Sequence, residues 1–151
     1  MKPLFDLYAR AGALANRLLP ESLLLLIARL GVGSIFFLSG RAKVEGWFTI
    51  TDGTYDLFKT DYALPFLPPY EAAWAATISE HLFSTLLFLG LFTRVGAIGL
   101  LGMTTVIEVF VYPDAWPTHL SWAGLLLPLV ARGGGCFSLD HLFGSRAGAE
   151  A

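Results

Sequence analysis

Four long apolar stretches constrain the fold of this sequence more than any other feature. They cover about residues 22–40, 70–92, 95–112 and 118–131, and a transmembrane helix needs about 20 mostly apolar residues. The chain is 55% hydrophobic and 15% charged, which is more apolar than a soluble domain. The sequence therefore predicts an all-α membrane protein, a four-helix transmembrane bundle in a single domain over residues 1–151.

The fourth stretch is the least regular of the four. It is short and it contains Pro128, which removes a backbone donor from a helix. A re-entrant or strongly kinked segment is therefore the alternative to a full span there.

The segment before the first span has the pattern of an amphipathic helix. Leu4, Tyr8, Ala11, Ala15 and Leu18 recur at helical spacing, and charged residues lie between them. Such a helix is typical of the interface between membrane and water. We expect an N-terminal interfacial amphipathic helix.

The connection between the first two spans is rich in aromatic residues. Rings of this kind favour the headgroup level of a bilayer, and the segment carries Trp47, Phe48, Tyr55, Phe58, Tyr62, Phe66 and Tyr70. We expect an aromatic outer loop in which residues 54–62 form a short helix across the mouth of the bundle.

Basic residues near the span ends predict the orientation. Cytoplasmic loops carry the excess of Lys and Arg, and one side of the predicted bundle has Lys2, Arg10, Arg17, Arg94, Arg132 and Arg146. The other side has fewer basic residues, and several acidic residues lie among them. The sequence predicts a multi-pass membrane protein with both termini in the cytoplasm.

Charge and cysteine content exclude two function classes. The formal net charge is −2, whereas nucleic-acid binding requires a basic patch. Cys136 is the only cysteine, so the chain cannot form an internal disulfide or supply both thiols of a dithiol exchange enzyme.

Ionisable residues lie inside the apolar stretches, where an unpaired charge is unfavourable. Helical periodicity places Arg29 and Lys43 on one stripe of the first span, and Glu80 on a small, polar stripe of the second. Counting about 1.5 Å per residue puts Arg29 and Glu80 near the membrane midplane. They are predicted to face each other as a buried pair, while Glu108 and His119 lie in the outer half.

These positions predict a polar cavity that binds a small molecule or relays protons. Its expected members are Arg29, Lys43, Glu80, Glu108 and His119, with His81, Trp47 and Tyr112 as accessory residues. No catalytic residue is assigned. The alternative is that the charges only hold the helices in register.

The histidines do not predict a metal or haem site. Glu80, His81, Glu108 and His119 have suitable ligand types, but a spacing such as HExxH is missing and Arg29 would compete. Two haem ligands need a common depth, and His119 is predicted nearer the outer surface than His81. We interpret His81 as a hydrogen-bonded helix contact.

Three segments resemble the DoxX family of small bacterial integral membrane proteins. They are FFLSGRAKVEGW at 36–47 and the stretches 62–94 and 111–143. The resemblance implies a four-span bundle in the bacterial cytoplasmic (inner) membrane. For the few members with assigned roles it also implies association with membrane redox systems, namely quinone-linked oxidation of sulfur compounds and complexes with oxidative-stress enzymes. It carries over Lys43, Glu80 and Arg94 as family positions, whereas His81 and Cys136 have no match.

Two functions remain open at this point. One is an integral membrane subunit of a redox-linked complex, non-catalytic or co-catalytic, with a quinone-sized polar cavity in the outer half of the bundle and redox partner proteins. The other is a small proton-coupled transporter that works as a homo-oligomer. No covalently bound cofactor is expected, quinone is the candidate ligand, and membrane lipid is the expected surrounding.

Overall fold

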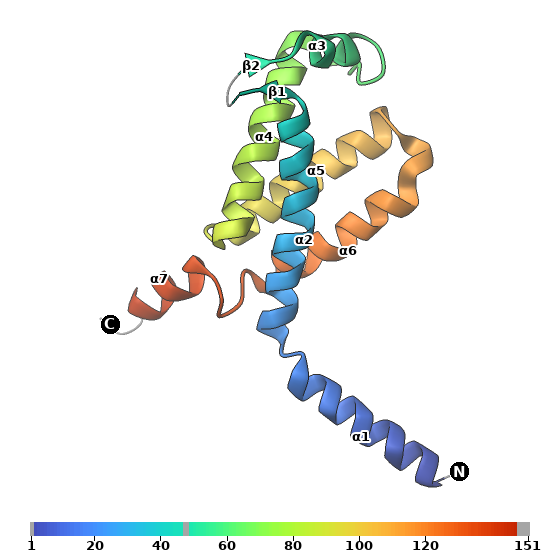
Figure 1. Cartoon of the computed structure of the whole chain (residues 1–151), viewed down its shortest axis with the longest axis vertical. Helices are drawn as coiled ribbons and strands as arrows, with labels where there is room; N and C mark the ends of the chain where they lie inside the picture. The colour runs from blue at the N-terminus through green and yellow to red at the C-terminus, as the bar shows by residue number, and fades with distance from the viewer. Residues whose placement is uncertain (1, 47–48, 148–151) are drawn as a thin grey trace.

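The computed structural model describes residues 2–46 and 49–147. The elements follow one another as α1 (Lys2–Leu18), α2 (Glu21–Ala42), β1 (Val44–Glu45), β2 (Thr49–Ile50), α3 (Asp52–Lys59), α4 (Pro69–Leu89), α5 (Thr93–Phe110), the 3₁₀ turn η1 (Pro113–Ala115), α6 (Trp116–Arg132) and α7 (Leu139–Ala147). Figure 1 shows α2 beside α4 and α5 beside α6, with the second pair inclined across the first.

Helices α2, α4, α5 and α6 form the predicted bundle. Within the described residues, α2, α4 and α5 are long and apolar enough to cross a membrane by length and composition. The fourth helix, α6, has 17 residues and continues through Pro128. The prediction of an all-α membrane bundle is confirmed, with three clearly apolar spans and α6 as the fourth packed helix.

The bundle has an apolar core between the inward faces of its four helices. A continuous cluster of buried side chains joins the four helices: Leu25, Ala28, Val32, Phe36, Leu87, Ala97, Leu100, Leu126 and Leu129. Glycine permits the closest helix approach, because a Cβ added at Gly99 would lie 2.4 Å from the Phe83 ring of α4. Leu and Phe side chains on the opposite faces stay exposed, as expected for helices that lipid surrounds.

The connection between α2 and α4 closes one end of the bundle. A two-stranded antiparallel hairpin pairs Val44 with Ile50, and α3 then packs on α4. The Thr51 side chain caps α3 by accepting from the Thr54 backbone N–H at 3.2 Å. The predicted helix across the bundle mouth is present, shifted to Asp52–Lys59, while the hairpin was not predicted.

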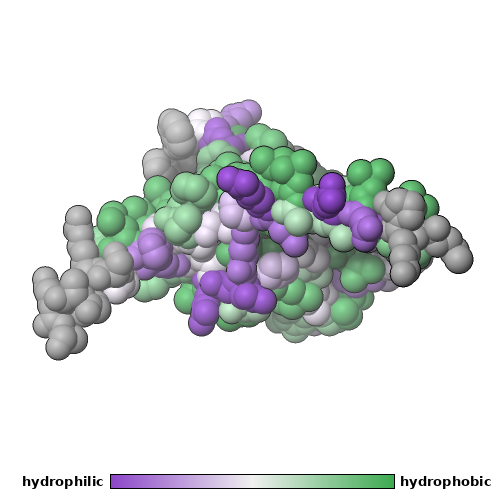
Figure 2. Space-filling model, turned by 90° about the horizontal axis from the view of Figure 1, so that it is seen from below, coloured by the Kyte–Doolittle hydropathy of each residue, from purple (hydrophilic) through white to green (hydrophobic). Residues whose placement is uncertain are grey.

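Helices α1 and α7 project from the other end of the molecule (Figure 1). From Leu4 to Leu18 every α1 residue is exposed, so its apolar face is uncovered, as an interfacial helix requires. Figure 2 looks at this end and shows hydrophilic side chains gathered across its middle. Ser138 caps the N-terminus of α7, because its Oγ accepts from the His141 N–H at 3.2 Å.

Candidate functional site

A cavity of about 390 Å³ lies in the half of the bundle next to α3. Small-molecule sites are usually apolar clefts of about 300–1,000 Å³ with a few polar groups, and this cavity has that character. Its lining comes from α2, α3, α4, α5, α6 and the 60–67 segment: Ser39, Lys43, Phe58, Tyr62, Leu64, Phe66, Leu67, Ala72, Ala75, Ala76, Ser79, Glu80, Met103, Val106, Ile107, Val111, Tyr112, His119 and Trp122.

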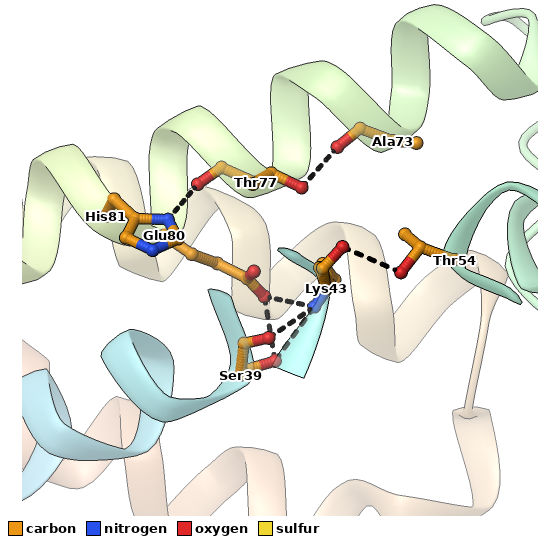
Figure 3. Close-up of polar contacts among 7 residues, drawn as sticks. All are labelled: Ser39, Lys43, Thr54, Ala73, Thr77, Glu80 and His81. Atoms are coloured by element: carbon orange, nitrogen blue, oxygen red, sulfur yellow. Dashed lines mark hydrogen bonds and ion pairs between the residues drawn. The ribbon is translucent and has the colours of Figure 1, made fainter. Parts of the chain in front are cut away.

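An ion pair forms one polar wall of this cavity (Figure 3). Lys43 Nζ lies 2.9 Å from Glu80 Oε1, and the two side chains are only 13% and 4% exposed. Ser39 joins them, because its hydroxyl donates to Glu80 Oε1 at 2.9 Å and accepts from Lys43 Nζ at 2.9 Å. A carboxylate this deeply buried requires such donors, so the pair holds both charges in the bundle.

Local structure positions both members of the pair. Lys43 caps the C-terminus of α2, and its carbonyl accepts from the Thr54 hydroxyl of α3 at 3.0 Å. One turn earlier, Gly40 faces α4, where an added Cβ would lie 3.1 Å from Glu80 Cβ and 2.8 Å from the His81 ring. The glycine therefore allows the close approach of α2 and α4 that brings lysine and glutamate together.

Glu80 keeps one acceptor unused. Its Oε2 atom is buried and finds no hydrogen-bond partner among the described residues. A carboxylate has room for about four hydrogen bonds, while Oε1 alone receives the lysine and the serine. The carboxylate therefore retains capacity for a further donor at the cavity wall.

A second acid–base pair lies on the α5–α6 side of the cavity. His119 Nδ1 is 2.5 Å from Glu108 Oε2, and the carboxylate fixes the tautomer because Nδ1 must carry the proton it donates. The histidine side chain is 6% exposed and the glutamate side chain 32%. His119 also packs against Trp122, with ring centroids 5.0 Å apart. The pair thus links the cavity wall to a more accessible carboxylate.

Aromatic side chains close the cavity beside α5. Tyr62 meets Tyr112 edge to face at 5.7 Å, and Phe66 meets Phe110 in the same way at 5.3 Å. A hydrogen bond with Tyr112 and then burial raise the pKa of Tyr62 to about 12, so its hydroxyl stays neutral at physiological pH. We call the 60–67 segment the lid, because it connects α3 to α4 and contacts the end of α5.

The predicted pair of Arg29 and Glu80 is wrong. The Arg29 guanidinium donates to Gly134 O at 2.9 Å and to Phe137 O at 3.0 Å, at the end of the bundle away from the cavity. The packing of α2 on α4 separates the two residues, because Glu80 lies opposite Gly40, which follows Arg29 by eleven residues on α2. At about 1.5 Å per residue, Arg29 lies about 16 Å along the helix from the level of Glu80, and Lys43 takes the place expected for Arg29.

The structure separates the remaining predicted residues. Lys43, Glu80, His119 and the accessory Tyr112 line the cavity, and Glu108 reaches it through His119. His81 does not line it. Its Nδ1 donates to Thr77 O at 2.8 Å, which confirms its interpretation as a helix contact.

Trp47, which was predicted as an accessory residue of the cavity, lies outside the described residues. Within residues 2–46 and 49–147, no three His, Cys, Asp or Glu side chains lie close enough together to hold a metal ion.

Sequence reasoning missed Ser39, Tyr62 and Trp122 as cavity residues. A signal existed for Ser39, which precedes Lys43 by one helical turn and therefore shares its face. Tyr62 was recognised only as one ring of an aromatic loop. Trp122 carried no signal, because an aromatic residue in an apolar helix is equally suited to core packing.

The fold and this cavity define a class, a multi-pass α-helical membrane protein with an internal, largely apolar site. The sequence model of the DoxX family matches residues 24–113, which is more than half of the chain. The protein belongs to the DoxX family. No curated protein and no solved structure matches the chain.

Proposed function

We propose that this protein is a membrane subunit of a redox-linked complex and that its cavity binds a quinone-class ligand. One observation carries the proposal: the bundle forms a partly open cavity of about 390 Å³ whose wall is mainly apolar, with a few polar groups gathered at Lys43–Glu80 and at His119. A quinone ring is flat and apolar, and its oxygens need hydrogen-bonding groups at defined points.

The available groups fit this ligand class. Tyr112 and Trp122 place a hydroxyl and an indole N–H among the lining residues, and either can donate to a carbonyl oxygen. Glu80 Oε2 is buried and accepts no hydrogen bond within the described part of the chain, and a turn of the carboxyl group toward the cavity would let it accept from a quinol hydroxyl. Both redox forms of the ligand therefore find partners.

The proposal assigns electron transfer to a partner protein. The chain has one cysteine, Cys136, which lies at the opposite end of the bundle from the cavity, where its N–H donates to Ser22 Oγ at 3.0 Å. No flavin fingerprint such as GxGxxG occurs in the sequence. The role of this subunit is then to hold the ligand at membrane depth for its partner.

Purified protein in mild detergent tests the proposal directly. Mass spectrometry of an organic extract should find a co-purifying quinone, and a short-chain quinone should quench tryptophan fluorescence through Trp122. Ala76→Phe, which fills the cavity, should abolish the quenching. Ile78→Phe is the matched control, since Ile78 is on the same helix and 54% exposed. Absence of binding, or equal binding to both variants, would refute the proposal.

The second candidate, a proton-coupled transporter, draws support from the Glu108–His119 pair. Its 2.5 Å contact joins a cavity residue to a carboxylate that is partly exposed, which is an arrangement suited to proton exchange. Such a transporter would work as a homo-oligomer. A dimer in detergent that contains no quinone and releases protons on substrate binding would favour this candidate over the first.

A further inference from the structure

A second recess, of about 460 Å³, lies at the end of the bundle opposite the cavity. It is formed where α5 begins, where α6 ends and where the 133–138 segment leads into α7. Two arginines, Arg94 and Arg132, line it together with His141 and the backbone of Gly133–Gly135. Neither the proposed ligand site nor the family match assigns a role to it.

The two arginines are accessible and only weakly engaged. Arg94 is exposed, and its guanidinium donates to Ala131 O over 3.3 Å. Arg132 pairs with Glu21 at 2.9 Å, but these side chains are 66% and 59% exposed. An exposed ion pair contributes little and exchanges readily. Both guanidinium groups can therefore turn toward an anion in the recess.

The acidic residue in the recess is already engaged. Asp140 accepts from the N–H groups of Phe92 and Thr93 at 2.7 and 2.8 Å, so its carboxylate caps the N-terminus of α5. Beneath it, the buried Arg29 guanidinium holds Gly134 O at 2.9 Å. The negative charge of Asp140 is thus already balanced by the N–H groups of α5 and by the nearby Arg29. The accessible charged groups of the recess are cationic.

We propose that this recess binds the phosphate of an anionic phospholipid headgroup. Arg94 is in the first turn of the apolar helix α5 and Arg132 is the last residue of α6, so both lie at the level where spanning helices leave the hydrocarbon. The planar guanidinium fork matches phosphate oxygens. Basic pockets between membrane helices at this depth suit anionic headgroups.

Native mass spectrometry of the full chain in detergent, titrated with phosphatidylglycerol, tests this inference. The Arg94→Gln/Arg132→Gln variant should bind about 30-fold more weakly, as expected for the loss of two cationic contacts near a headgroup. The matched control is Arg10→Gln/Arg17→Gln, which removes two exposed arginines from α1 at the same end of the molecule. Its affinity should stay close to that of the parent.

Two further arms identify the source of the phosphate and check the fold. Phosphatidylcholine, which carries phosphate without net charge, should bind much more weakly than phosphatidylglycerol. Inorganic phosphate at millimolar concentration should not displace the lipid, and displacement would assign the recess to a free anion instead. Arg94→Lys/Arg132→Lys should restore part of the affinity, which a folding defect would not. Equal losses in the recess and control variants would overturn the proposal.

Discussion

At the residue scale, the decisive feature is the buried ion pair between Lys43, at the end of α2, and Glu80 of α4. Lys43, Glu80 and Ser39 form three contacts of 2.9 Å, and removal of one partner would leave the other charged and desolvated. A broken buried pair usually costs about 3–5 kcal/mol. The pair is therefore a feature of stability as well as a wall of the cavity.

Glu80→Gln and Lys43→Met should each lower the thermal unfolding temperature in detergent strongly, and the double variant should lose less than the sum. The exposed pair Lys59–Asp56, also 2.9 Å apart, is the control, since its removal should cost at most about 1 kcal/mol. Arg29→Gln combined with Glu80→Gln should be additive, because the two side chains make separate contacts. Additive losses for Lys43 and Glu80 would contradict the pairing.

Glu108 should serve ligand binding more than folding. Its side chain is 32% exposed, so Glu108→Gln removes a charge that is only partly buried and keeps an oxygen that accepts from His119 Nδ1. The variant should unfold at nearly the parent temperature and bind quinone more weakly in the fluorescence titration. Glu71→Gln, in the first turn of α4, controls for the general loss of a carboxylate. A misfolded variant, or unchanged binding, would show that Glu108 has another role.

At the element scale, the lid and α3 decide how the cavity is closed. The hairpin and α3 are tied to the end of α2 through Lys43 O and Thr54, and the lid then reaches α5 through the Tyr62–Tyr112 and Phe66–Phe110 contacts. Leu64 and Leu67 of the lid also pack against the buried cluster of Phe58, Ala72 and Ala73. The lid is therefore fixed to α3, α4 and α5 together.

The Tyr62 hydroxyl gives the lid a defined response to alkali. Its pKa is about 12 in the folded protein, against an ordinary value of 10.0. The unfolded chain therefore loses this proton first, so the stability that Tyr62 contributes is complete below pH 10 and is lost as the pH rises toward 12. Thermal unfolding should show this loss in the parent and a smaller one in Tyr62→Phe. Tyr8→Phe, at a position on α1 that is 79% exposed, should behave as the parent does.

At the scale of the whole molecule, the two ends of the bundle differ in chemistry. The hairpin and α3 lie at one end and α1 and α7 at the other (Figure 1). The lid and the cavity belong to the first end, and the arginine-lined recess to the second. Because basic residues concentrate on the cytoplasmic side of membrane proteins, we expect α1 and α7 in the cytoplasm and the cavity toward the outer side.

Cysteine labelling measures this orientation. In a Cys136→Ser background, an impermeant thiol reagent applied to intact cells should label Asp52→Cys, which is at the start of α3. It should not label Ser145→Cys in α7 until the membrane is opened. The reverse pattern would invert the topology and place the cavity toward the cytoplasm.

The sequence by itself determined the helices and their inward faces. Span positions depend on hydropathy over about 20 residues, and the shared stripe of Arg29 and Lys43 depends on local periodicity, so both can be recovered without knowledge of the neighbours. Four of the five predicted cavity residues therefore belong to one site or are bonded to it.

Only the tertiary structure decided which charges meet. Counting residues from the predicted span ends gives Arg29 and Glu80 a common depth, but α2 packs on α4 with Gly40, not Arg29, opposite Glu80. Arg29 then finds carbonyl groups that are more than 100 residues away in the sequence, and Glu80 finds Lys43 across the close approach at Gly40. Periodicity gives the direction of a side chain around its helix axis. A pairing also requires the position of one helix along the other and, for Arg29, the position of a distant loop.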